Sequence, residues 1–160
     1  MATLHIPYFD EIDKDSVEDY YEADIELNGQ SISLDINLDD DPPANWADLY
    51  TKYAGKLNEY EVAIRRIIKG YYPEEGMVRE FFTYHQEELP DEMEELFNNT
   101  DQSLSEDDRL MAMLKLDRIG FYFDRNNFAT WDFSFGDFTD QILVIITDGK
   151  GEILDITWES

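Results

Sequence analysis

Two early stretches of the chain alternate between apolar and polar residues. Along 21–27 the apolar positions are separated by Glu and Asp, and along 32–38 by Ser, Asp and Asn. Period two is typical of strands with one buried face. Asn28-Gly29 stands between the two stretches and favours a type I′ turn, because both residues tolerate positive φ. The pattern predicts a β-hairpin, to which residues 4–9 are expected to add an edge strand.

The apolar positions then recur at steps of three and four residues. This spacing places one apolar stripe along a helix and predicts a single long helix over 46–71, about 39 Å in length. Gly70 and Pro73 are expected to end it. Shorter helices with apolar faces are predicted over 78–89, 90–97 and 105–114.

The last third of the chain returns to period two. Strands are predicted over 119–123, 131–135, 142–146 and 154–158. The third of these is apolar on both faces, as is typical of a central strand. The predicted fold is therefore α+β, in a single domain over 1–160. Its antiparallel sheet combines the N-terminal hairpin with a C-terminal four-stranded meander, packed against the long helix and two or three shorter helices inserted between the β segments.

The charge of the chain is its most unusual property. The 160 residues include 38 acidic and 12 basic side chains, for a formal net charge of -26. Such a field repels phosphate backbones and anionic lipid, so we expect neither nucleic acid nor a membrane as a partner. It attracts basic proteins. Six acidic residues in two dense runs are predicted to be exposed and to face such a partner: Asp39, Asp40, Asp41, Glu92, Glu94 and Glu95.

Residue types that carry common chemistry are scarce. Cysteine is absent, which excludes disulfides, thiol nucleophiles and thiolate metal sites. Of the two histidines, His5 and His85, the second lies on an apolar stripe typical of a packed core histidine. We therefore predict no metal site, no cofactor and no catalytic residue. The start of the chain lacks the features of a signal peptide, so the cytoplasm is the expected location.

The predicted strands of the last third carry one polar constellation. If Phe121, Phe133 and Ile156 face the core, six polar residues share the opposite face: Arg118, Tyr122, Asp132, Ser134, Asp155 and Thr157. Such a face fits either a ligand or partner site or a solvated surface with cross-strand pairs, and the solvated surface is favoured. Alternation through 142–146 also leaves apolar side chains on this face, which indicates that something covers it.

Several short motifs stand out along the chain. They lie at 25–30, 87–89, 116–122, 131–136, 139–140, 151–153 and 159–160. Together they resemble a bacterial family catalogued as domain of unknown function two thousand and four, from whose usual residues Trp131 and Trp158 depart. The resemblance covers most of the chain and implies a bacterial cytoplasmic protein. Because that family has no established activity, it carries over no catalytic residue.

The leading hypothesis from the sequence is a non-enzymatic acidic interaction protein that binds a basic protein, as bacterial immunity proteins do. One alternative is a small-ligand-binding protein or an enzyme that uses the polar sheet face. Another is a DNA mimic, whose carboxylates stand in for phosphates. The sequence predicts no oligomeric state.

Overall fold

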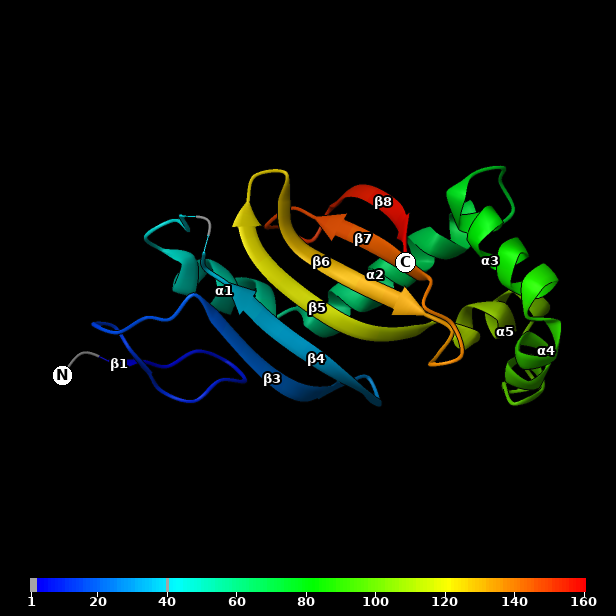
Figure 1. Cartoon of the computed structure of the whole chain (residues 1–160), viewed down its shortest axis with the longest axis horizontal. Helices are drawn as coiled ribbons and strands as arrows, with labels where there is room; N and C mark the ends of the chain where they lie inside the picture. The colour runs from blue at the N-terminus through cyan, green and yellow to red at the C-terminus, as the bar shows by residue number, and fades with distance from the viewer. Residues whose placement is uncertain (1–2, 40) are drawn as a thin grey trace.

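The structure is a computed structural model that describes residues 3–39 and 41–160. Over these residues it has eight strands and five helices (Figure 1). Six strands form one mixed sheet in the order β3-β4-β5-β6-β7-β8, and two short strands form a separate antiparallel sheet. The α+β class predicted from the hydrophobic pattern is confirmed.

The predicted hairpin is present at one edge of the large sheet. Its strands are β3 (Tyr20–Leu27) and β4 (Gln30–Asn37), which pair antiparallel. Asn28 and Gly29 have φ values of 49° and 82°, as the type I′ turn requires.

The expected edge strand at 4–9 is wrong. β1 (Thr3–Leu4) pairs with β2 (Ile12–Asp13) in the small sheet. Phe9 packs edge-on against Tyr21 and Tyr50. The N-terminal segment therefore closes the core beside the first helix, because its apolar side chains are buried better there than along an exposed sheet edge.

The last four strands follow one another as antiparallel neighbours. They are β5 (Lys115–Asp124), β6 (Asn127–Ser134), β7 (Ile142–Thr147) and β8 (Ile153–Glu159). The sheet as a whole is not antiparallel, because β4 and β5 pair in parallel, with Leu34 opposite Ile119. Parallel neighbours need a crossover, and the helical segment between β4 and β5 provides it.

The long helix predicted over 46–71 is two helices. α1 (Trp46–Ala54) ends before Gly55, and α2 (Leu57–Tyr71) begins two residues later. Glycine costs about 1 kcal/mol relative to alanine in a helix, which favours a break at this position. Tyr53 and Leu57 flank the break and are both buried, so the apolar stripe continues across it.

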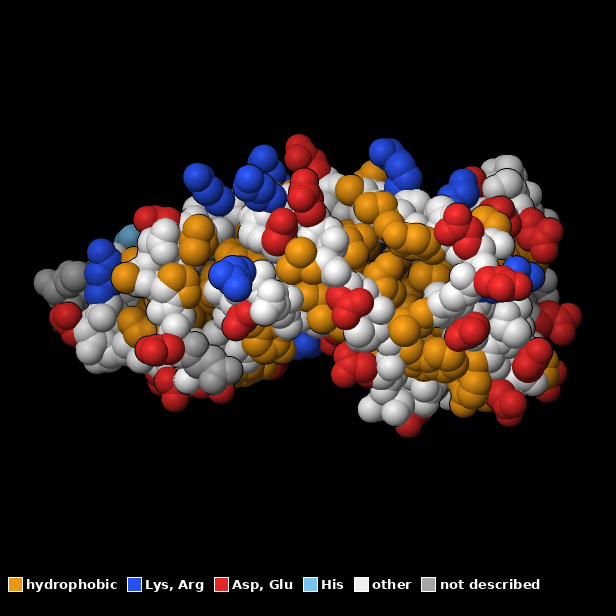
Figure 2. Space-filling view, turned by 90° about the horizontal axis from the view of Figure 1, so that it is seen from above, with side chains coloured by type: hydrophobic (Ala, Val, Ile, Leu, Met, Phe, Trp, Pro, Cys, Tyr) orange, Lys and Arg blue, Asp and Glu red, His pale blue; other side chains and the backbone are white. Residues whose placement is uncertain are grey.

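The three remaining helices gather at one end of the molecule, away from the β1–β2 end (Figure 1). They are α3 (Met77–Glu88), α4 (Pro90–Asn98) and α5 (Glu106–Met113). Ser105 caps α5, accepting a hydrogen bond from the Asp108 amide at 3.2 Å. Acidic side chains dominate this end in the space-filling view, at the right of Figure 2.

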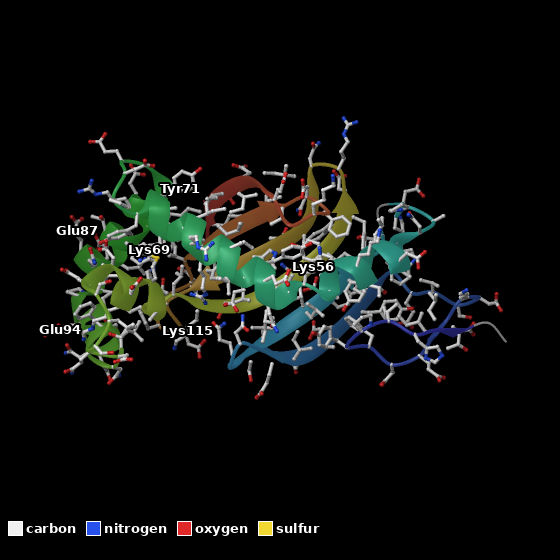
Figure 3. All side chains as sticks on the ribbon, turned by 180° about the vertical axis from the view of Figure 1, so that it is seen from behind. Lys56, Lys69, Tyr71, Glu87, Glu94 and Lys115 are labelled. Carbon is white, nitrogen blue, oxygen red and sulfur yellow. The ribbon has the colours of Figure 1, made fainter. Side chains whose placement is uncertain are left out.

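The core lies between the sheet and the helices. Trp46, at the start of the predicted helical stripe, is buried, and so are Phe121, Phe133 and Ile145 of the predicted strands. α1 and α2 run along one face of the sheet, as the view from behind shows (Figure 3). The face that lies opposite these helices holds the site described next.

Candidate functional site

The candidate site is the face of the six-stranded sheet opposite α1 and α2, here called the open face. In the described residues, 3–39 and 41–160, no helix packs over it (Figure 1). Strand register turns seven carboxylates toward it: Glu22, Asp24, Glu26, Asp35, Asp132, Asp155 and Glu159. Within the described strands its basic residues are Arg118 and Lys115. The open face is therefore acidic.

Arg118 lies at the centre of this face and is held from three sides. Its Nε and Nη2 donate to the two carboxylate oxygens of Asp35 at 2.5 and 2.8 Å. Nη2 also donates to the Tyr122 hydroxyl at 2.6 Å, and Nη1 donates to Asp132 at 3.3 Å. Burial alone would lower the pKa of Arg118, but the hydrogen bonds with Asp35 and Tyr122 raise it. The guanidinium is a fixed cation with nearly all of its donors in use.

Asp35 and Asp132 share Arg118 unequally. The Asp35 side chain is only 2% exposed and takes the short, two-point pair. Asp132 receives one longer hydrogen bond, and its side chain is 15% exposed. Burial raises the pKa of the Asp132 carboxyl, and the Arg118 charge only partly offsets this. Asp132 is thus a carboxylate whose removal from water is incompletely compensated.

A hollow of about 330 Å³ opens beside this cluster. Three aliphatic residues of β7 line it: Ile142, Val144 and Ile146. Its polar lining comes from β5, β6 and β8: Arg118, Tyr122, Asn127, Thr130, Asp132 and Glu159. β7 is not the central strand that its apolar pattern predicted but lies next to the edge strand β8. The apolar side chains that the sequence placed on the outer face of this strand are thus found inside a rim of polar groups.

The structure brings together only part of the constellation expected from the sequence. Arg118, Tyr122 and Asp132 are in direct contact. Ser134 is buried instead and donates to the Asp117 carboxylate at 2.5 Å. Asp155 lies exposed on the edge strand β8, outside the hollow.

The two acidic runs expected to face a partner lie outside the strands of the open face, one after β4 and the other on α4. Asp39 and Asp41 are exposed, and Asp40 lies outside the described residues. Glu92, Glu94 and Glu95 are exposed on α4 at the helical end; Figure 3 labels Glu94 there, together with Glu87 of α3. Asp39 and Asp41 line a small hollow together with Tyr122, at the margin of the Arg118 cluster, whereas the α4 glutamates lie at the far, helical end (Figure 1).

Sequence reasoning missed Asp35 and Glu159 as members of the site. Asp35 has the same parity as Ser33 and Asn37 in its strand, so the alternation does place it on a polar face. What no local pattern showed was that β4 would lie next to β5, which sets Asp35 opposite Gly120 and beside Arg118. Glu159 is the last residue of β8 and continues the alternation of Asp155 and Thr157, so extending that pattern by two residues would have placed it on the same face.

A larger hollow of about 660 Å³ lies between the hairpin turn, α2 and α5. Glu61 in its wall is buried and accepts from Asn28 at 2.6 Å, Gln30 at 2.7 Å and Arg65 at 2.8 Å. Arg65 also donates to the Leu114 carbonyl at 2.7 Å. These bonds join the hairpin turn, α2 and the start of β5, so the network serves to hold the fold together.

Two further properties of the described residues concern metal ions and membranes. Within 3–39 and 41–160, no group of three or more His, Asp or Glu side chains is placed to hold a metal ion. None of the helices in that same part of the chain has the length and apolar character needed to cross a membrane.

Comparison with known proteins returns no family model, no curated protein and no solved structure that matches this chain. The resemblance to domain of unknown function two thousand and four therefore stays a prediction.

Proposed function

We propose that this protein is a non-enzymatic binding protein that holds a basic protein partner on the open face of its sheet. The observation that carries the proposal is the composition of that face: seven carboxylates against two basic residues, together with an aliphatic strip on β7. An apolar centre within a polar rim is the usual composition of a protein interface. Complementary charge would steer a basic partner toward it.

The open face is favoured over the acidic helical end. Residues 73–109 carry 13 acids and two bases, so this end attracts cations over a distance. Its exposed glutamates, however, are spread over separate helices. On the open face, strand pairing places Asp132, Asp155 and Glu159 on the two strands that flank the apolar strip of β7. That strip supplies the contact area that fixes a partner's position.

A site for an anionic ligand is disfavoured by the geometry of Arg118. To bind an external anion, its guanidinium would have to leave Asp35, whose side chain is 2% exposed. Leaving a buried charge without its partner costs about 3–5 kcal/mol. A new ion pair at a solvent-exposed site returns only about 0.2–1 kcal/mol, so the exchange is unfavourable. This argument weakens the alternative of an enzyme or ligand site that uses Arg118.

The test is selection from a library of random dodecapeptides displayed on phage, carried out on the immobilised protein near physiological ionic strength. We expect the selected peptides to carry net positive charge. One variant neutralises the open face (Asp24→Asn, Asp155→Asn and Glu159→Gln), and a matched variant removes the same charge from the helical end (Glu92→Gln, Glu94→Gln and Glu95→Gln). All six side chains are exposed, so both variants should fold.

The proposal expects the open-face variant to lose about tenfold or more in peptide affinity, because contact carboxylates are removed. The helical-end variant should lose much less, because it reduces only long-range attraction. Selected peptides without net positive charge, or equal losses in the two variants, would contradict the proposed function.

A further inference from the structure

The hollow on the open face has the composition of a receptor for one long cationic side chain. Ile142, Val144 and Ile146 line it along one strand. Lysine and arginine bury an aliphatic stem against such surfaces while the charged head stays among polar groups. Asp132 and Glu159 stand in the same lining, at opposite sides of the aliphatic strip, on β6 and β8.

The charge of the hollow remains negative after its own cation is counted. Arg118 is matched by Asp35, which accepts two of its hydrogen bonds. Asp132 keeps only the longer bond, at 3.3 Å, and Glu159 accepts from the Thr157 hydroxyl at 3.1 Å. Two carboxylates are therefore left with spare acceptor capacity beside an apolar surface.

The alternative occupants fit less well. An anion meets two carboxylates and a guanidinium that is already in use. An aliphatic side chain would fill the apolar part but would cover the Asp132 carboxylate without replacing its lost hydration, which is costly. A cation on an aliphatic stem satisfies both parts of the lining at once.

We infer that the hollow lined by β7, Asp132 and Glu159 receives a single lysine or arginine side chain of the basic protein partner. This inference rests on the proposed function and adds to it the group that is recognised. The stem lies along Ile142, Val144 and Ile146, and the head group pairs with the two carboxylates. Tyr122 completes the wall, its hydroxyl held by Arg118 at 2.6 Å.

The experiment uses two matched pentapeptides, acetyl-Gly-Ser-Arg-Ser-Gly-amide and its citrulline counterpart, which keeps the shape of arginine without the charge. Each is titrated into the ¹⁵N-labelled full chain while amide shifts are followed. We expect saturable shifts at Tyr122, Asp132 and Val144 with the arginine peptide, at a dissociation constant on the order of 1 mM. The citrulline peptide should bind at least about tenfold more weakly.

Three variants identify the pairing groups. Asp132→Asn and Glu159→Gln should each weaken the arginine peptide about threefold or more, since each removes one partner of the cation. Glu94→Gln removes the same charge from the helical end, outside the open face, and should change the affinity less than about twofold. Glu159 is exposed, so its variant remains a fair test even if Asp132→Asn disturbs the Arg118 cluster.

Equal binding of the citrulline peptide, the absence of saturable shifts, or an effect of Glu94→Gln as large as that of Glu159→Gln would overturn the inference. If the hollow fails these tests while selected basic peptides still bind the open face, the proposed function stands without it. If the arginine peptide fills the hollow but no basic protein or longer peptide binds, the site takes a free basic amino acid and the proposed function is wrong.

Discussion

Gly120 lies directly under the guanidinium of Arg118: a methyl group at Gly120 would overlap the Nη2 atom of that side chain. Gly120 is opposite Asp35 in the parallel pair, and an Asp35 oxygen also lies close to the same position. The absence of a side chain at Gly120 therefore lets the Arg118–Asp35 pair lie flat on the sheet.

Gly120→Ala should consequently displace Arg118 and destabilise the protein by about 1–3 kcal/mol, the usual range for over-packing a filled site. Gly70→Ala is the matched control. An added methyl there meets open space near the end of α2, so the control should be neutral or stabilise by about 0.4–1 kcal/mol. Urea unfolding of the two variants measures this, and similar stabilities would show that the guanidinium does not need the space.

Tyr53 should contribute to stability through its hydroxyl. Trp131 Nε1 donates to it at 2.8 Å, and it shares a 2.7 Å hydrogen bond with Thr147, all in the core. Tyr53→Phe leaves buried polar groups without a partner and should cost about 1–3 kcal/mol. Tyr60→Phe, at a half-buried tyrosine in ring contact with Tyr53, should cost less than about 0.5 kcal/mol. Equal costs in chemical denaturation would argue against the hydrogen-bonded role.

His85 should make stability depend on pH. It is buried in α3, and its Nδ1 donates to the Phe81 carbonyl at 2.8 Å, so Nε2 accepts from the Thr139 hydroxyl at 3.0 Å. Burial lowers the pKa of His85 below its ordinary value of about 6.5. The unfolded chain then binds a proton that the folded chain does not. The contribution of neutral His85 to the free energy of unfolding should therefore fall as the pH drops below about 6.5. The fall ends once the pH reaches the lowered pKa of the folded state.

The measurement compares the wild-type chain with His85→Gln from pH 8 to 5. Any other group that titrates over this range does so in both proteins, so the difference between the two unfolding free energies isolates His85. We expect that difference to shrink as the solution is acidified. A difference that stays constant over this range would contradict the assignment.

Salt should raise the melting temperature. A net charge of -26 is more concentrated in the folded chain than in the unfolded chain, so screening relieves repulsion mainly in the folded state. We expect a higher melting temperature at about 0.5 M NaCl than at about 0.01 M, where the Debye length is roughly 30 Å. An unchanged or lower melting temperature in a thermal scan would show that the charges are compensated in another way.

The local pattern of apolar and polar residues was sufficient to predict those elements whose spacing matches the face that the fold buries. Asn28-Gly29 between two alternating stretches predicted the hairpin, and the same alternation placed Phe121 and Phe133 in the core. It did not show the helix break at Gly55, because Tyr53 and Leu57 are four residues apart and keep the helical spacing across the break. Periodicity reports which side of a helix is buried, and Tyr53 and Leu57 are both buried although a break separates them.

The site was only partly predictable for a related reason. Arg118, Tyr122 and Asp132 belong to adjacent strands of one meander, so alternation alone placed them on a common face. Asp35 joins them through the pairing of β4 with β5, two strands separated in sequence by residues 38–114, and only the tertiary fold specifies such a pairing.

The most direct test of the proposed function is to locate the binding surface itself. A selected basic peptide is added to the ¹⁵N-labelled protein, and the amides that shift are assigned. The account predicts that the largest changes fall on the open face, at Asp24, Val144 and Thr157 among others. Changes concentrated on α3, α4 and α5, with the open-face amides unmoved, would contradict it.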